Sequence, residues 1–172
     1  MAFLELKSIL EQTAKRYGYD PALLAGQAWQ ESRFNPKARS GAGAMGLMQF
    51  MPDTWAEWGR SADPEDPAAS ADAGVRYMRH LMARYASAAE PVSVALAAYN
   101  WGMGNVDKAI QKSGRTDWQG LAPFLPAETR DYVPRILNRA AFYKAAFITG
   151  IAGPAVALLG LLAFLLVRRI TA

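Results

Sequence analysis

Glu31 is the residue whose position most clearly suggests chemistry. It follows Ala28, Trp29 and Gln30 at the carboxyl end of an apolar stretch, where its carboxyl group can lose part of its hydration. Lost hydration disfavours the charged form, so this placement predicts a raised pKa and an acid still protonated near neutral pH. Such an acid can protonate a leaving oxygen, as cleavage of a glycosidic bond requires. The alternative is an ordinary solvated glutamate at a helix end.

Glu31 belongs to the first of four short segments that stand out together. They are 31–36 (ESRFNP), 43–49 (GAMGLMQ) with Met51-Pro52, 98–102 (AYNWG) and 128–134 (ETRDYVP). The Asn-Pro pair of the first segment ends a helix, and the glycines that follow permit turns and close backbone approach. These surroundings favour a catalytic Glu31 over a solvated one.

Composition excludes several other kinds of chemistry. The chain has no cysteine, which removes disulfides, thiolate zinc sites and cysteine nucleophiles. Its one histidine, His80, would have to serve any Ser-His-Asp triad, and we interpret it as a surface or packing residue. We expect no metal and no cofactor. The net charge of +4 is weak and the basic residues form no long run, so no nucleic-acid partner is expected.

The four segments, in this order, closely resemble the lytic transglycosylase domain of the superfamily of soluble lytic transglycosylases and goose-type lysozymes. The resemblance covers about residues 5–142. It implies a lysozyme-like enzyme that cleaves the MurNAc-GlcNAc β-1,4 bond of peptidoglycan glycan strands. Glu31 would act first as acid on the leaving sugar and then as base on the muramic acid 6-hydroxyl, which gives a 1,6-anhydro end.

The same resemblance implies assistance from the substrate's own acetamido group, so a second catalytic carboxylate is not required. The nearest candidates for one are Asp53 and Asp131, for which we expect no direct role.

The resemblance also implies six substrate-binding positions. The serine matches one that contacts the acetamido group, and the methionine and glutamine match residues that line the glycan groove. The first tyrosine and the asparagine bound the subsite beside the acid, and the second tyrosine places its hydroxyl near the catalytic carboxyl. A turn residue is the simpler interpretation of the serine, and a core residue that of the methionine. The six are Ser40, Met48, Gln49, Tyr99, Asn100 and Tyr132.

The elements that must position these residues are all predicted to be helices. Asp20-Pro21 is typical of a helix start and should open a helix that runs to about Ser32. No stretch alternates as a strand would, so the fold class is all-α. The other expected helices cover 1–17, a short segment after Pro52, 68–86, 91–99, 106–112 and a last helix from about Glu128, with a loop between the last two.

Residues 145–167 are uncharged and lie between Lys144 and Arg168. A helix of this length spans roughly 34 Å, enough for a bilayer core, so the sequence predicts one transmembrane helix. The alternative is a buried C-terminal helix. We therefore expect an enzyme domain at 1–143 and a membrane anchor with a short basic tail at 144–172, with the lipid bilayer as a partner. Small residues in the span could also pair two copies.

The first ten residues include Glu5 and Lys7 and lack the apolar run of a secretion signal. A virion membrane or the host inner membrane, with action in the periplasm, is the expected location. The expected role is local wall penetration during phage entry, with phage structural proteins as possible partners. Alternatives are a hydrolytic muramidase on the same fold used for lysis, a bacterial tail-anchored wall enzyme, and a catalytically silent membrane-anchored peptidoglycan-binding protein.

Overall fold

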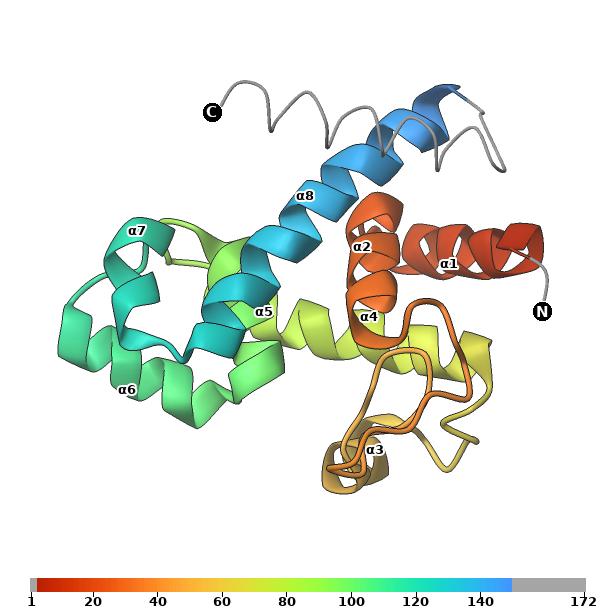
Figure 1. The fold of residues 1–172 in the computed structure, drawn as a ribbon, viewed down its shortest axis with the longest axis horizontal. Coiled ribbons are helices and arrows are strands. Elements are labelled where there is room, and N and C mark those ends of the chain that lie inside the picture. The colour runs from red at the N-terminus through yellow and green to blue at the C-terminus, as the bar shows by residue number, and fades with distance from the viewer. Residues whose placement is uncertain (1–2, 150–172) are drawn as a thin grey trace.

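The computed structural model describes residues 3–149, and this part of the chain is helical apart from its loops and two isolated β-bridges (Figure 1). The predicted all-α class is confirmed for this range. In chain order the elements are α1 (Phe3–Tyr17), α2 (Pro21–Ser32), α3 (Pro52–Trp58), α4 (Pro67–Arg84), α5 (Pro91–Trp101), α6 (Met103–Ser113), α7 (Trp118–Leu121), the 3-10 helix η1 (Ala122–Phe124) and α8 (Ala127–Thr149).

Helices α2 and α4 begin in the same way, with an aspartate followed by a proline. The Asp20 carboxylate accepts a hydrogen bond at 2.8 Å from the backbone N–H two residues later. Asp66 accepts one at 2.7 Å from the N–H three residues later. Proline fits the first helical position because the N–H that it lacks would have had no helical partner. The predicted start of α2 is therefore confirmed, and α4 begins one residue before the predicted start.

The loop predicted between the last two helices was wrong, because it contains α7 and η1. Asp117 caps α7 by accepting a hydrogen bond from the backbone N–H of Gly120 at 3.0 Å. Arg115 holds that carboxylate from the other side at 2.6 Å. Leu121 at the end of α7 is fully buried, so tertiary packing stabilises a helix too short to be apparent from periodicity.

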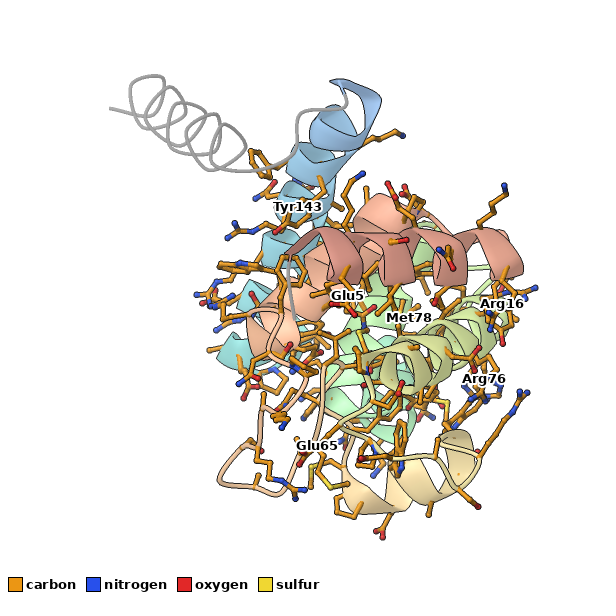
Figure 2. All side chains as sticks on the ribbon, turned by 90° about the vertical axis from the view of Figure 1, so that its right-hand side faces the viewer. Glu5, Arg16, Glu65, Arg76, Met78 and Tyr143 are labelled. Atoms are coloured by element: carbon orange, nitrogen blue, oxygen red, sulfur yellow. The ribbon has the colours of Figure 1, made fainter. Side chains whose placement is uncertain are left out.

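Helix α2 lies at the centre of the fold, packed between α1 and α8 (Figure 1). Its residues 22–28 are buried, and α4 and α5 complete the core around it. Met78 of α4 is a fully buried member of this core (Figure 2). At Gly26 the two backbones of α2 and α8 nearly touch, since a Cβ there would lie 2.9 Å from the Ile136 carbonyl oxygen. Glycine at this position lets α8 approach α2 closely enough for their side chains to meet.

The predicted membrane span, 145–167, lies outside the described residues from position 150 onward, as does most of the predicted anchor segment 144–172. Among residues 3–149, none of the helices is both long enough and apolar enough to cross a bilayer.

Candidate active site

Glu31 lies in the last turn of α2, where the chain leaves the helix abruptly. Arg33 adopts the left-handed conformation (φ 55°) and donates its backbone N–H to the Trp29 carbonyl at 2.9 Å. Phe34 also has a positive φ, of 64°. Two such residues in succession turn the chain away from the helix axis. The Glu31 side chain therefore remains partly exposed at the helix end, where a ligand can reach it.

Tyr132 of α8 holds the Glu31 carboxyl group. Its hydroxyl donates a hydrogen bond to Oε1 of Glu31, although the two residues are 101 positions apart. The Tyr132 side chain is buried, with 4% of its surface exposed, so its ring is fixed between α2 and α8. The close packing of these helices at Gly26 is what brings the two side chains together.

The pKa of Glu31 is raised from an ordinary glutamate value to about 8. Burial is the largest cause, because the ionised carboxylate loses hydration that the protein does not fully replace. The hydrogen bond from Tyr132 lowers the pKa in part, and the negative charge of Glu128 raises it. Glu31 is consequently a protonated acid at neutral pH, held in one orientation by a neutral tyrosine. This combination suits general acid catalysis.

Replacing Tyr132 with Phe is expected to raise the pKa of Glu31 further, because the hydrogen bond that it removes favours the ionised carboxylate. The free energy of unfolding should fall by about 1–3 kcal/mol, the usual effect of leaving a buried partner unpaired. NMR titration of the Glu31 carboxyl carbon and thermal denaturation measure the two effects.

Tyr85→Phe is the matched control, since it removes a hydroxyl that bonds Asp107 at 2.9 Å away from the candidate site. It should leave the pKa of Glu31 unchanged. An unchanged pKa in Tyr132→Phe would contradict the contact between Tyr132 and Glu31.

The loop after α2 is folded back on itself by Gln49. The side-chain nitrogen of Gln49 donates to the carbonyls of Ala38 at 3.0 Å and Gly46 at 2.9 Å. Gln49 itself has a positive φ of 49°, which the loop imposes. A glutamine amide can bond sugar hydroxyls with both of its ends, but the nitrogen end of Gln49 is engaged by the loop. Its carbonyl oxygen makes no hydrogen bond to residues of the described part of the chain.

Gly46 allows this loop to pack against the segment that precedes α4. Its φ is 77°, and a Cβ at this position would lie only 2.0 Å from the Pro64 carbonyl oxygen. Its backbone N–H also donates to the Ala38 carbonyl at 2.9 Å. The loop conformation therefore depends on the absence of a side chain at position 46.

Ser40 and Met48 occupy very different surroundings in this loop. Ser40 is exposed, and its hydroxyl accepts a hydrogen bond from the Ala44 N–H at 3.0 Å, as a turn residue would. Met48 is fully buried, and its side chain packs on Gly74 of α4. The Met48 side chain therefore has no surface that a ligand could contact, and the core interpretation fits it.

Tyr99 connects the loop between α2 and α3 (residues 33–51, the Gln49 loop) to Glu31. Its hydroxyl donates to the Met48 carbonyl at 2.9 Å, and its ring packs edge-on against Phe50. Burial raises the pKa of Tyr99 well above its usual value, and the charge of Glu31 contributes to the increase. The Tyr99 hydroxyl is thus neutral, and its ring lies near the carboxyl group of Glu31.

Asn100 is held by two residues of α8. Its side-chain oxygen accepts a hydrogen bond from the Thr129 hydroxyl at 2.7 Å, and its nitrogen donates to Glu128 at 3.3 Å. Thr129 is almost fully buried. Helices α5 and α8 thus fix the orientation of the Asn100 amide. Of the predicted site residues, Tyr132 contacts Glu31 and Tyr99 lies near it, whereas Asn100 is linked to Glu31 through Glu128.

Two residues near the acid were missed by the sequence analysis. Glu128 was quoted only as part of a motif, yet its charge acts on the pKa of Glu31. Gln27 is fully buried one helical turn before Glu31, and its side chain lies beside the Tyr132 hydroxyl and lowers the pKa of that tyrosine. A polar residue four positions before the acid in an apolar helix was the signal that could have identified it.

The two aspartates considered as a second carboxylate are not part of this cluster. Asp131 is exposed and pairs with Arg135 at 2.8 Å. Asp53 is exposed in the first turn of α3. The carboxylate with an influence on Glu31 is instead Glu128.

A family model described as the transglycosylase SLT domain matches residues 8–121. Membrane-bound lytic murein transglycosylase C of Mannheimia succiniciproducens is 42% identical over 113 residues, which cover 58% of this chain and 32% of the relative. Membrane-bound lytic murein transglycosylase F of Desulfosudis oleivorans is 36% identical over 135 residues, which cover 73% of this chain and 30% of the relative. The chain thus spans about a third of the length of these curated relatives.

Two solved structures of lytic transglycosylases have a fold similar to that of this chain. The 70 kDa soluble lytic transglycosylase of Escherichia coli superimposes with a TM-score of 0.68 at 28% identity, over 87% of this chain and 25% of that protein. A complex of the 70 kDa soluble lytic transglycosylase with bulgecin A gives a TM-score of 0.71 at 26% identity, over 85% of this chain and 24% of that protein.

Proposed function

The chain belongs to the transglycosylase SLT domain family, and from this premise we propose that it is a peptidoglycan lytic transglycosylase with Glu31 as its catalytic acid and base. The single observation that carries the proposal is the state of that carboxyl group. Its pKa is raised to about 8 at the end of α2, and Tyr132 orients it. Names of the relatives support peptidoglycan, also called murein, as the substrate.

In the proposed reaction Glu31 transfers two protons. It first protonates the oxygen that leaves as the 4-hydroxyl of GlcNAc, while the bond from that oxygen to C1 of MurNAc breaks. The Glu31 carboxylate then removes the proton of the MurNAc 6-hydroxyl, whose oxygen bonds to C1 and closes the 1,6-anhydro ring. Glu31 ends protonated as it began, and water is not consumed. Burial favours the protonated starting state.

The neighbouring residues are proposed to hold the glycan. The free carbonyl oxygen of Gln49 accepts hydrogen bonds from sugar hydroxyls, because its nitrogen is occupied by the loop. Tyr99 and Asn100 bound the subsite beside the acid, and the exposed Ser40 contacts the acetamido group that assists departure of the leaving sugar. Tyr132 orients Glu31 from within the protein.

Mass spectrometry of digested sacculi tests the reaction. The expected products carry 1,6-anhydro-MurNAc ends. Reducing MurNAc ends without anhydro product would identify a hydrolytic muramidase on the same fold and contradict the transglycosylase. Binding to sacculi without release of fragments would identify a peptidoglycan-binding protein and contradict both enzymes.

We also propose that residues 1–143 form the enzyme domain and that residues 144–172 anchor it to a membrane through the apolar stretch 145–167. The relatives are named membrane-bound lytic murein transglycosylases, and these names support an association with membranes. Flotation with liposomes should carry the full chain but not a variant with Leu161→Arg and Leu165→Arg. Flotation of both proteins, or flotation of neither, would contradict the anchor.

The proposed biological setting is local wall penetration during phage entry, from a virion membrane or the host inner membrane. Its support is the apolar stretch near the C-terminus, which would hold the enzyme domain at a membrane. Immunoblotting of purified virions beside host inner-membrane fractions is the test. Absence from virions, with the enzyme domain accessible to protease on the periplasmic face of uninfected cells, would contradict a role in entry.

A further inference from the structure

Trp29 carries an arginine on each face of its ring where α2 meets α8. The guanidinium carbon of Arg33 lies 3.5 Å from the ring centroid, and that of Arg139 lies 3.4 Å from it. Two groups at these distances fit only on opposite faces of the indole, because on one face they would overlap. Two positive charges are therefore held at most about 7 Å apart, the sum of the two distances.

The positive charge at this stack is not balanced by the protein. Within residues 5–144, neither Arg33 nor Arg139 has a carboxylate at ion-pair distance, whereas exposed arginines elsewhere do, such as Arg84 with Asp107. Arg135 on α8 is paired with Asp131 at 2.8 Å, yet its positive charge still acts on Arg33. Both Arg139 and Arg135 lower the pKa of Arg33, after the larger effect of burial. An anion at the stack would relieve this repulsion.

The stack leaves the hydrogen-bonding edges of both guanidinium groups available. Stacking uses the flat faces, whereas the N–H donors of arginine point outward in the plane and match the two oxygens of a carboxylate. Arg33 uses one side-chain nitrogen to donate to the Trp29 carbonyl at 3.1 Å, which fixes its plane. Within the part of the chain that the structure describes, the side chain of Arg139 makes no hydrogen bond and contacts the Trp29 ring.

The stack is built from the two helices that form the candidate active site. Arg33 follows Glu31 by two residues, and Arg139 follows Tyr132 by seven, which is about 10 Å along α8. Positions 132 and 139 lie on the same face of the helix. Tyr143, one turn further along α8, is buried (Figure 2). The charges of Arg139 and Arg33 both act on its hydroxyl and lower its pKa, although burial raises that pKa overall. A chain attached to a sugar near Glu31 covers this distance with three or four extended residues.

We propose that Arg33 and Arg139 form an anion site that binds a carboxylate of the peptide attached to the muramic acid residue. This rests on the proposed function, since that substrate carries short peptides with free carboxylates beside the bond to be cleaved. The site would select peptide-bearing regions of the wall. The phosphate of an anionic lipid is the rival occupant, and the helices shared with Glu31 favour the peptide.

The test compares two substrates made from the same sacculi. One is intact sacculi, and the other is glycan strands freed of peptides by an amidase. Arg33→Gln and Arg139→Gln should each lower kcat/KM on intact sacculi by about tenfold, as expected for a lost charge-assisted hydrogen bond, and leave cleavage of bare strands unchanged. Arg84→Gln is the control, because it removes an exposed arginine distant in the fold. It should affect neither substrate.

Each other outcome would overturn the proposal. An equal loss on both substrates would indicate that the arginines only pack on Trp29, and no loss on either would exclude an anion site used in cleavage. Reduced binding to anionic vesicles with both cleavage rates unchanged would assign the site to a lipid.

Calorimetry with a soluble disaccharide-peptide distinguishes failure of the proposed enzyme activity from failure of the anion site, because binding of this fragment does not depend on cleavage. The wild type should bind this fragment about tenfold more tightly than the bare disaccharide, and Arg139→Gln should remove the preference. Equal binding of the two fragments by the wild type would overturn the anion site, even if cleavage is observed.

Discussion

Glu31→Gln is expected to lower the rate of glycan cleavage by roughly 10²–10⁴-fold while the fold is retained, the usual contribution of a positioned acid. Glutamine has nearly the same shape and can still accept the hydrogen bond from Tyr132, but it has no proton to transfer. In the wild type, activity should fall as the pH rises through about 8, because the acid is lost there. Release of soluble fragments from sacculi across a pH series measures both effects.

The same variant should be more stable than the wild type at neutral pH. The folded protein binds the Glu31 proton more tightly than the unfolded chain does, because burial raises the pKa to about 8. The contribution of this proton to the free energy of unfolding is fully present below the ordinary glutamate pKa. It is lost as the pH rises from that pKa through about 8, because the unfolded chain releases the proton more readily. Glutamine does not ionise, so the advantage of the variant should grow across this interval.

Glu57→Gln, an exposed glutamate in α3, serves as control and should change neither the rate nor this pH dependence. A Glu31→Gln protein with more than a tenth of the wild-type rate would exclude Glu31 as the acid.

Gly46→Ala is expected to lower the free energy of unfolding by on the order of 4 kcal/mol, from two costs that add. A side chain is strained at a φ of 77°, and the new Cβ would meet the Pro64 carbonyl oxygen at 2.0 Å. Because that oxygen belongs to the backbone, the loop must move to relieve the contact. The movement would also displace the Gly46 carbonyl that Gln49 bonds. Urea denaturation measures the loss of stability.

Two neighbouring glycines separate the two costs. Gly43 has a φ of 94° and open space around its position, so Gly43→Ala should show only the cost of the strained backbone, about 1–2 kcal/mol. Gly41 has open space and no positive φ, so Gly41→Ala should be nearly neutral. A Gly46→Ala protein no less stable than Gly43→Ala would show that the contact with Pro64 is not limiting.

Local signals in the sequence were sufficient to predict most of the helices and to single out Glu31 as the candidate acid. The start of α2 at Pro21 depends on the side chain of Asp20 and on the ring of proline, both of which act within three residues. Glu31 was identified because an apolar helix followed by Asn-Pro places a carboxyl group at its end. Helix α7 was missed because it has four residues and depends on the burial of Leu121 in the core.

Contacts between distant segments were decided only by the tertiary structure. Tyr132 was assigned to the site by resemblance, but its hydrogen bond to Glu31 exists because Gly26 lets α8 approach α2. The availability of one end of the Gln49 amide depends on carbonyls at positions 38 and 46, which no pattern around residue 49 reveals. Arg33 and Arg139 meet on Trp29 for the same reason, since 106 residues separate them and only packing brings them to one ring. Sequence patterns report the conformation of neighbouring residues, whereas hydration and charge at a site depend on which helices pack around it.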